Sequence, residues 1–260
     1  MVRELAVFRE FFAGHADQFV LIGGAAATLA MEEAGLEFRA TKDLDIVLHV
    51  EALSPGFGAA FWRFIEAGRY EIRQASSTGK PVLYRFQKPG DESFPVMLEL
   101  FCRKPDGIFL AEGAHLTPIP IDDAIASLSA ILVDDVYYGF IVSGRKEIDG
   151  LPMVGEDRLI PLRARAWLDL NERHARGERV DAKDIRKHAN DALRLSQLFA
   201  PDTRISVAAG IAADLHRFLD GIEIDPSINP KALMLGNSVA ATADRIAKAY
   251  DLRPRRATGS

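Results

Sequence analysis

Apolar and polar residues alternate differently in the two halves of the chain. Before about residue 155, short apolar runs stand between turn residues, which is typical of strands joined by turns. The strands expected from this pattern are 18–22, 43–49, 69–75, 81–87, 95–102, 117–121 and 135–142. The helices expected in the same half are 3–14, 25–35, 57–67 and a short one that begins at Asp122-Asp123.

The second half of the chain has helical periodicity throughout. From Pro161 to Tyr250 apolar residues recur at three- and four-residue intervals, and Pro161 suits the first turn of a helix. We therefore predict an α/β (α+β) protein, with a mixed sheet and flanking helices in residues 1–155 and a helical bundle in residues 156–252. The arginine-rich residues 253–260 are expected to form a flexible basic tail.

Composition limits the possible function classes. The chain has 260 residues, a single cysteine and a formal net charge of −5, so it is neither a disulfide scaffold nor coated in positive charge. No apolar stretch is long enough to cross a bilayer, and the first residues do not resemble a signal peptide, so we expect a cytoplasmic protein with no membrane partner. Cys102 follows a run of apolar residues and is expected to be buried rather than nucleophilic.

Two carboxylates in the expected strand 43–49 give the clearest chemical signal. Strand side chains alternate between faces, so Asp43 and Asp45 point the same way, while the apolar residues beside them point to the other side. Two like charges on one face repel and are costly to desolvate. A hard divalent cation such as Mg²⁺ would offset both effects. The alternative is an exposed face on which Lys42 and Arg39 are the partners.

The segment before these carboxylates suits a phosphate. Gly23 and Gly24 stand between an apolar strand and a helix, where backbone N–H groups and the positive end of the helix dipole favour an anion. Thr41 can hydrogen-bond a phosphate, and Arg39 can pair with it. Alternatively, the two glycines make only a tight connection, and Thr41 and Arg39 are solvated loop residues.

These motifs resemble the nucleotidyltransferases of the DNA polymerase β superfamily, and more narrowly its AbiEii-type branch, over roughly residues 15–200. The shared pattern is apolar-Gly-Gly, a helix, and then Arg-x-Thr-x-Asp-x-Asp at residues 39–45. The resemblance implies a third carboxylate on a neighbouring strand, which Glu99 supplies. It also implies a nucleotidyltransferase-like sheet domain in which Asp43, Asp45 and Glu99 hold two Mg²⁺ or Mn²⁺ ions, one on a nucleoside triphosphate and one on the attacking hydroxyl.

In the helical half the matches to this family are looser. Asp181 is a good N-cap, and Asp184 at the third helical position is favoured by the helix dipole alone. In the family, the matching lysine and aspartate help to position nucleotide or acceptor, which implies the same for Lys183 and Asp184. Capping and function therefore stay open for this pair. His188 is expected to be a structural hydrogen-bonding residue.

Two arginines on the preceding helix are candidates for the triphosphate. Arg163 and Arg165 stand two residues apart, so they face different directions, and only one can point at the nucleotide. Asp169 is a plausible surface partner for Arg165, which favours Arg163 as the cofactor-binding residue. Trp167 at helical spacing is expected in the core.

The expected activity is metal-dependent transfer of a nucleoside monophosphate from a nucleoside triphosphate to an acceptor hydroxyl. The resemblance implies tRNA or a protein side chain as the acceptor. It also implies a toxin role in a toxin–antitoxin or phage-defence system, with a cognate antitoxin as partner. Two other interpretations stay open, namely adenylyl transfer to an antibiotic or other small molecule, and a non-catalytic scaffold that acts through a partner protein. An acidic acceptor cleft would favour a cationic drug, and a basic groove would favour nucleic acid.

Overall fold

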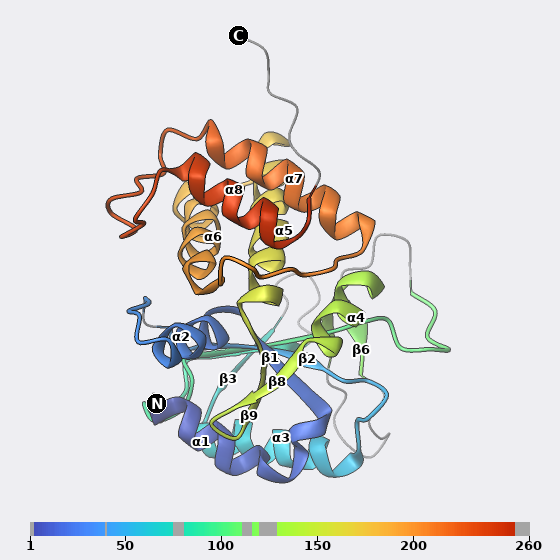
Figure 1. Cartoon of the computed structure of the whole chain (residues 1–260). Coiled ribbons are helices and arrows are strands. Elements are labelled where there is room, and N and C mark those ends of the chain that lie inside the picture. The colour runs from blue at the N-terminus through green and yellow to red at the C-terminus, as the bar shows by residue number, and fades with distance from the viewer. Residues whose placement is uncertain (1–2, 40, 75–80, 111–115, 120–128, 253–260) are drawn as a thin grey trace. The chain divides into compact units, whose positions relative to one another are not determined.

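The computed structural model describes residues 3–39, 41–74, 81–110, 116–119 and 129–252 (Figure 1). The chain divides into two compact units, Met1–Gly155 and Glu156–Ser260. Each unit has its own core and is described by itself. None of the helices in the described ranges is long and apolar enough to cross a membrane.

The described part of the first unit contains a mixed sheet of nine strands. Seven of them follow the order β3-β4-β5-β2-β1-β9-β8, while β7 pairs with β5 and with β6. The strands are β1 Phe19–Ile22, β2 Asp43–Leu48, β3 Glu71–Gln74, β4 Pro81–Gln87, β5 Met97–Cys102, β6 Leu116–Pro118, β7 Ser129–Leu132, β8 Arg145–Ile148 and β9 Leu151–Val154. The pairs β2·β5, β1·β9 and β5·β7 are parallel, and the other pairs are antiparallel.

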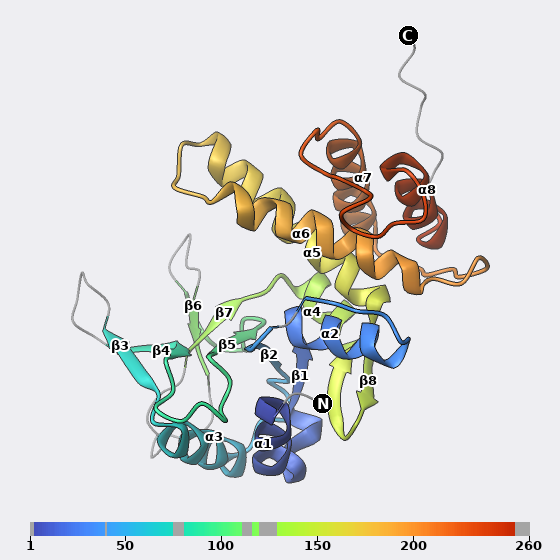
Figure 2. The same ribbon diagram turned by 90° about the vertical axis from the view of Figure 1, so that its left-hand side faces the viewer.

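Helices cover both faces of this sheet. Figures 1 and 2 show α1 (Arg3–Phe12) and α3 (Pro55–Gly68) against one face and α2 (Gly23–Glu33) on the other. An aromatic core joins α1, α3 and β1, with rings packed face to face and edge to face. Its fully buried members are Phe8, Phe12, Phe19, Phe57, Phe61 and Phe64.

The second unit consists of helices, as its periodicity predicts. They are α5 Glu156–Ala175, α6 Ala182–Leu195, α7 Ala209–Glu223 and α8 Val239–Ala249. Pro161 lies inside α5 and not in its first turn, which corrects the expected helix start. A proline has no N–H to donate to the carbonyl four residues earlier, here that of Asp157. The Tyr250 hydroxyl donates to that carbonyl at 2.8 Å, and its burial raises the pKa of Tyr250 well above the ordinary value.

The fold class is confirmed as a mixed α/β protein, but one expected strand was wrong. Residues Asp135–Ser143 form the helix α4, because the Asp134 carboxylate caps the N–H groups of Val136 and Tyr137. The continuous apolar run there fits a buried helix as well as a strand. The sequence interpretation also missed β7 and the β8–β9 hairpin. The helix expected at Asp122-Asp123 and the tail at 253–260 lie outside the described residues.

Candidate active site

The predicted carboxylates lie on one face of two adjacent parallel strands. Asp45 on β2 is in register with Glu99 on β5, and Asp43 is in register with Met97. All three acids are half-buried, whereas Leu44 and Leu98, which alternate with them, are fully buried. Register partners on neighbouring strands share a face, so Asp43, Asp45 and Glu99 belong to one surface of the sheet, called here the carboxylate face.

The carboxylate face is the side of the sheet away from α3. Leu98 is in register with Leu44 on β2 and with Phe86 on β4, so these three side chains share the opposite face. Phe86 packs against Phe61 and Trp62 of α3 with ring centroids 5.5 and 6.0 Å apart. The apolar half of the alternation therefore builds the core, and the acidic half lies on the opposite face of the sheet.

The glycine pair fits tightly against two of the predicted site residues. Ile22, the last residue of β1, pairs with Asp45, and α2 begins at the next residue. Gly23 has φ +72°, and a Cβ atom there would lie 1.8 Å from Oδ2 of Asp45. A Cβ atom on Gly24 would lie 2.9 Å from the Thr41 hydroxyl oxygen. A side chain at either position would therefore displace Asp45 or Thr41, and the positive φ of Gly23 itself favours glycine.

The remaining residues of this segment have identifiable contacts. The Thr41 hydroxyl oxygen lies 3.5 Å from the backbone N–H of Asp43. Arg39 places its guanidinium 5.7 Å from the ring centroid of Phe38. Lys42 forms an ion pair with Glu4 at 3.0 Å, so it is not the partner of the carboxylates that the exposed-face alternative needed.

Arg85 on β4 is a site residue that the sequence interpretation missed. It is in register with Glu99, and its Nε donates to Oε1 of Glu99 at 2.5 Å. A row of side chains across three strands therefore reads Arg85, Glu99, Asp45. In the sequence, alternation along the expected strand 81–87 places Arg85 on the face opposite the core residue Phe86. That Arg85 lies beside Glu99 follows only from the pairing of β4 with β5.

The donor chemistry of the carboxylate face suits a hard divalent cation, since Mg²⁺ and Mn²⁺ prefer carboxylate oxygens. Within the described residues, however, no three His, Cys, Asp or Glu side chains are gathered into a metal-binding group. Glu99 is engaged by Arg85 instead. The backbone register brings the three acids to one face of the sheet. On that face Glu99 forms an ion pair with Arg85 and does not gather with Asp43 and Asp45 into a metal-binding group.

Arg163, predicted to bind the triphosphate, lies in the core of the second unit. Its side chain is 9% exposed, with Nε 3.6 Å from Oδ2 of Asp191 and Nη1 3.4 Å from Nδ1 of His188. The structural role expected for His188 agrees with this contact. Asp191, one helical turn beyond His188, is also buried and pairs with Arg163.

Arg165 does not have the partner that the sequence predicted. Its Nη1 lies 3.5 Å from Asp214 on α7, whereas Asp169 lies 3.9 Å from Arg173. Residues four apart on one helix can pair, but here the packing of α7 against α5 offers Arg165 a different acid. Trp167 is buried and packs edge-to-face on Phe218 of α7, as expected for a core residue.

Lys183 and Asp184 lie at the start of α6 and are exposed. The expected cap is present, since the Asp181 carboxylate accepts the N–H of Lys183 at 2.8 Å. This hydrogen bond accounts for Asp181 as the helix cap, but it indicates no role for the side chains of Lys183 and Asp184. Their approach to the carboxylate face, like that of Arg163, stays a prediction.

A second polar cluster closes the other end of the same strands. Glu51 follows β2 and accepts hydrogen bonds from Arg103 at 2.6 Å and from Tyr138 at 2.7 Å. Burial would raise the pKa of Glu51, but these two hydrogen bonds outweigh it and hold that pKa below the ordinary value. The neighbouring Cys102 is buried, as expected, and burial raises its pKa to about 12, which excludes a thiolate nucleophile.

No protein-family model and no curated protein matches this chain. Among solved structures, it is similar to one described as "putative nucleotidyltransferase from H. pylori", with 14% identity, a TM-score of 0.44 and coverage of 97% of both chains. It is also similar to JHP933 from Helicobacter pylori, with 15% identity, a TM-score of 0.33 and coverage of 96% of this chain and 89% of the other. Likenesses at these scores do not establish a shared activity.

Proposed function

We propose that the carboxylate face binds a nucleoside triphosphate with Mg²⁺ or Mn²⁺ and that the protein is a nucleotidyltransferase. The observation that carries this proposal is the contact between the start of α2 and Asp45 across Gly23, with Glu99 in register beside it. A helix N-terminus that meets a carboxylate pair offers the two complements of a metal triphosphate, namely N–H groups for phosphate oxygens and carboxylates for the cation.

Each residue of the face has a role in this proposal. Asp43 and Asp45 would hold the cation, and Glu99 would join them once Arg85 releases it. The ion, when bound, neutralises phosphate charge and lowers the pKa of the acceptor hydroxyl.

The loop and the glycines would position the triphosphate. Gly23 and Gly24 allow the phosphates to approach the N–H groups of α2, while Thr41 and Arg39 would contribute a hydroxyl and a cation. Positioning and charge neutralisation supply most of the rate in such transfers, so small displacements of these groups should be costly.

The acceptor and the biological role are the finer part of the proposal. The resemblance of residues 39–45 and of the helical half to the AbiEii-type branch favours a hydroxyl on tRNA or on a protein, and a toxin role with a cognate antitoxin. Lys183 and Asp184 would then help to position nucleotide or acceptor. Arg163 is the weakest member of the set, because Asp191 and His188 already account for its position.

Transfer of label from α-labelled nucleoside triphosphates to total RNA or to lysate protein, with Mg²⁺ or Mn²⁺, tests the proposal. Asp45→Asn should lower transfer by at least about a thousandfold, or about 4 kcal/mol of transition-state stabilisation. Glu71→Gln is the matched control, since Glu71 is an exposed carboxylate on β3, two strands away from Glu99, and is paired with Lys88. Undiminished transfer by the folded Asp45→Asn protein would contradict the site, and the labelled product identifies the acceptor.

A further inference from the structure

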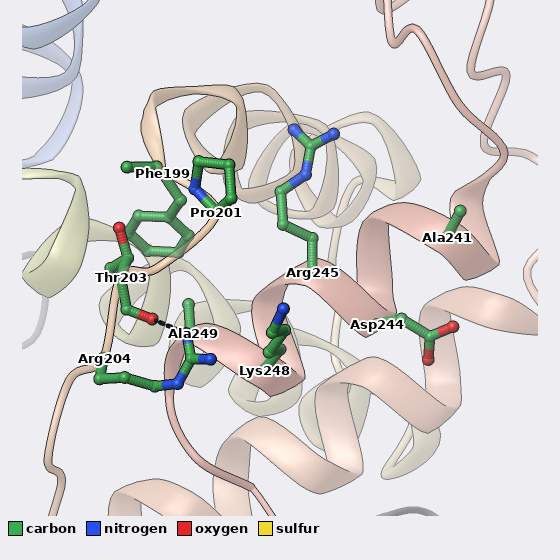
Figure 3. A pocket seen from close by; sticks show the side chains of 10 residues that line it. Phe199, Pro201, Thr203, Arg204, Ala241, Asp244, Arg245, Lys248 and Ala249 are labelled. Atoms are coloured by element: carbon green, nitrogen blue, oxygen red, sulfur yellow. Dashed lines mark hydrogen bonds between the residues drawn. The ribbon is translucent and has the colours of Figure 1, made fainter.

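A cleft of about 450 Å³ lies within the second unit, between the segment 199–204 and α8 (Figure 3). Its wall includes three cationic side chains and one acid among small and apolar residues. The lining residues that carry charge are Arg204, Arg245, Lys248 and Asp244. None of them belongs to the carboxylate face, and the motifs of the sequence do not explain them.

The cations come together because of how α8 is packed. Thr242, Ala243 and Ile246 of this helix are buried in the core of the unit. The opposite stripe, which includes Arg245 and Lys248, therefore faces the cleft. The segment before α7 is fixed against the end of the helix, where the N–H of Ile205 donates to the Ala249 carbonyl at 2.7 Å. This bond holds Arg204 beside the last turn of α8.

The charge of the cleft is not balanced by protein carboxylates. In the described part of the chain, no acid forms an ion pair with Arg204, Arg245 or Lys248, and Figure 3 shows Asp244 directed away from Arg245. Other arginines of this unit do have acidic partners, namely Arg158, Arg163, Arg165, Arg173, Arg176 and Arg217. Three cations against one acid leave the cleft with a charge of about +2 in a chain whose net charge is −5.

The other wall of the cleft is apolar. Phe199 is buried, and its ring packs edge-to-face on Tyr250 at 5.7 Å. Pro201 and Ala200 continue this wall. A cleft of this volume is within the range that small-molecule sites occupy, and a cationic side facing an apolar side suits a ligand with one anionic and one ring-like part.

We propose that this cleft binds a nucleoside monophosphate group. A phosphate monoester carries a charge of about −1.5 to −2 at neutral pH, which matches the cleft, and arginine and lysine are its usual ligands. Arg204, Arg245 and Lys248 hold the phosphate, and the nucleoside lies along the Pro201 side. The group belongs either to a free nucleotide or to the phosphorylated end of an oligonucleotide. This site does not rest on the activity proposed above.

Equilibrium binding to the full chain tests the inference, with AMP, GMP, CMP and UMP in one arm. A short RNA with a 5′-phosphate, and the same RNA with a 5′-hydroxyl, form the other arm. We expect saturable binding in at least one arm, with the phosphorylated RNA at least about tenfold tighter than the hydroxyl form if the oligonucleotide is the source. Free nucleotides binding as tightly as the phosphorylated RNA would identify the nucleotide as the source.

Variants distinguish specific binding in the cleft from non-specific attraction of an anion to positive charge. Arg245→Gln and Lys248→Gln should each weaken binding by about tenfold, while Lys231→Gln, an exposed lysine of the same unit outside the cleft, should leave it unchanged. Asp45→Asn should also leave binding to the cleft unchanged. The test of the cleft is therefore independent of whether the carboxylate face has the proposed activity. Equal effects of the three glutamine variants, or no binding by the folded wild-type protein at millimolar ligand, would overturn the inference. If a cleft variant fails to fold, competition by inorganic phosphate on the wild-type protein decides, and no competition would also overturn it.

Discussion

Asp45 in the sheet unit and Asp191 in the helical unit are both acids shielded at least in part from solvent, but their surroundings differ. Asp191 is 2% exposed, and Arg163 lies 3.6 Å away with His188 beside it, so packing of the helices explains it fully. Asp45 lies half-buried on a sheet face, against a glycine that has no room for a side chain. We therefore assign Asp191 a role in the stability of the helical unit. For Asp45, which lies against the glycine at the start of α2, we propose a role in ligand binding.

The distinction between the two acids would fail if substituting either one changed the free energy of unfolding by the same amount. Asp191→Ala leaves Arg163 as a buried charge without its acid, and should lower the free energy of unfolding of the helical unit by about 3–5 kcal/mol. Asp45→Asn should change the stability of the sheet unit by less than about 1 kcal/mol. Denaturant unfolding checks both, because Trp62 reports on one unit and Trp167 on the other. A larger loss for Asp45→Asn would reverse the roles assigned here.

The glycine at the start of α2 offers a sharper form of the same test. Gly23 and Gly35 have nearly equal φ angles of +72° and +71°, but a Cβ atom on Gly35 would meet nothing within 4 Å. Both alanine variants carry the left-handed strain of about 1–2 kcal/mol. Gly23→Ala should cost at least about 1 kcal/mol more, because it also displaces Asp45. It should abolish transfer, while Gly35→Ala retains it. Equal costs and equal activities would show that Gly23 is only a connection.

Arg85 should compete with the cation for Glu99. Arg85→Gln removes the competing charge and should tighten Mn²⁺ binding by about three- to tenfold, as expected for the loss of a half-buried ion pair of about 1 kcal/mol. Calorimetric titration of Mn²⁺ measures this without any need for activity, and Arg69→Gln, away from the face, serves as control. Weaker Mn²⁺ binding by Arg85→Gln would mean that the arginine supports the site instead of masking it.

The smallest effect expected concerns the proline inside α5. Tyr250→Phe should cost about 1 kcal/mol, since the Asp157 carbonyl loses its hydrogen bond. In a Pro161→Ala background, the restored N–H can donate to that carbonyl, so the same substitution should cost less. Unfolding of the four proteins completes a double-mutant cycle, and a coupling near zero would separate the tyrosine from the proline.

Local patterns in the sequence predicted the parts of the site that one strand or one turn defines. Alternation in β2 placed Asp43 and Asp45 on one face, and the glycine pair marked the start of α2. Arg85 escaped notice because its meaning depends on the register of β4 against β5, which no local pattern specifies. The helix α4 was mistaken for a strand because a short apolar run fits both, and only its Asp134 cap distinguishes them. The contact of Arg163 with the buried Asp191 was not foreseen, because Asp191 lies on a different helix.

The central claim is that the carboxylate face is a metal–nucleotide site, and nucleotide binding at equilibrium with and without Mn²⁺ tests it most directly. A fluorescent non-hydrolysable nucleoside triphosphate should bind the wild-type protein only with the metal present. The Asp43→Asn/Asp45→Asn protein should bind it at least about tenfold more weakly, while Glu71→Gln binds as the wild type does. Metal-independent binding of equal strength in all three proteins, or none in the folded wild-type protein, would contradict the account.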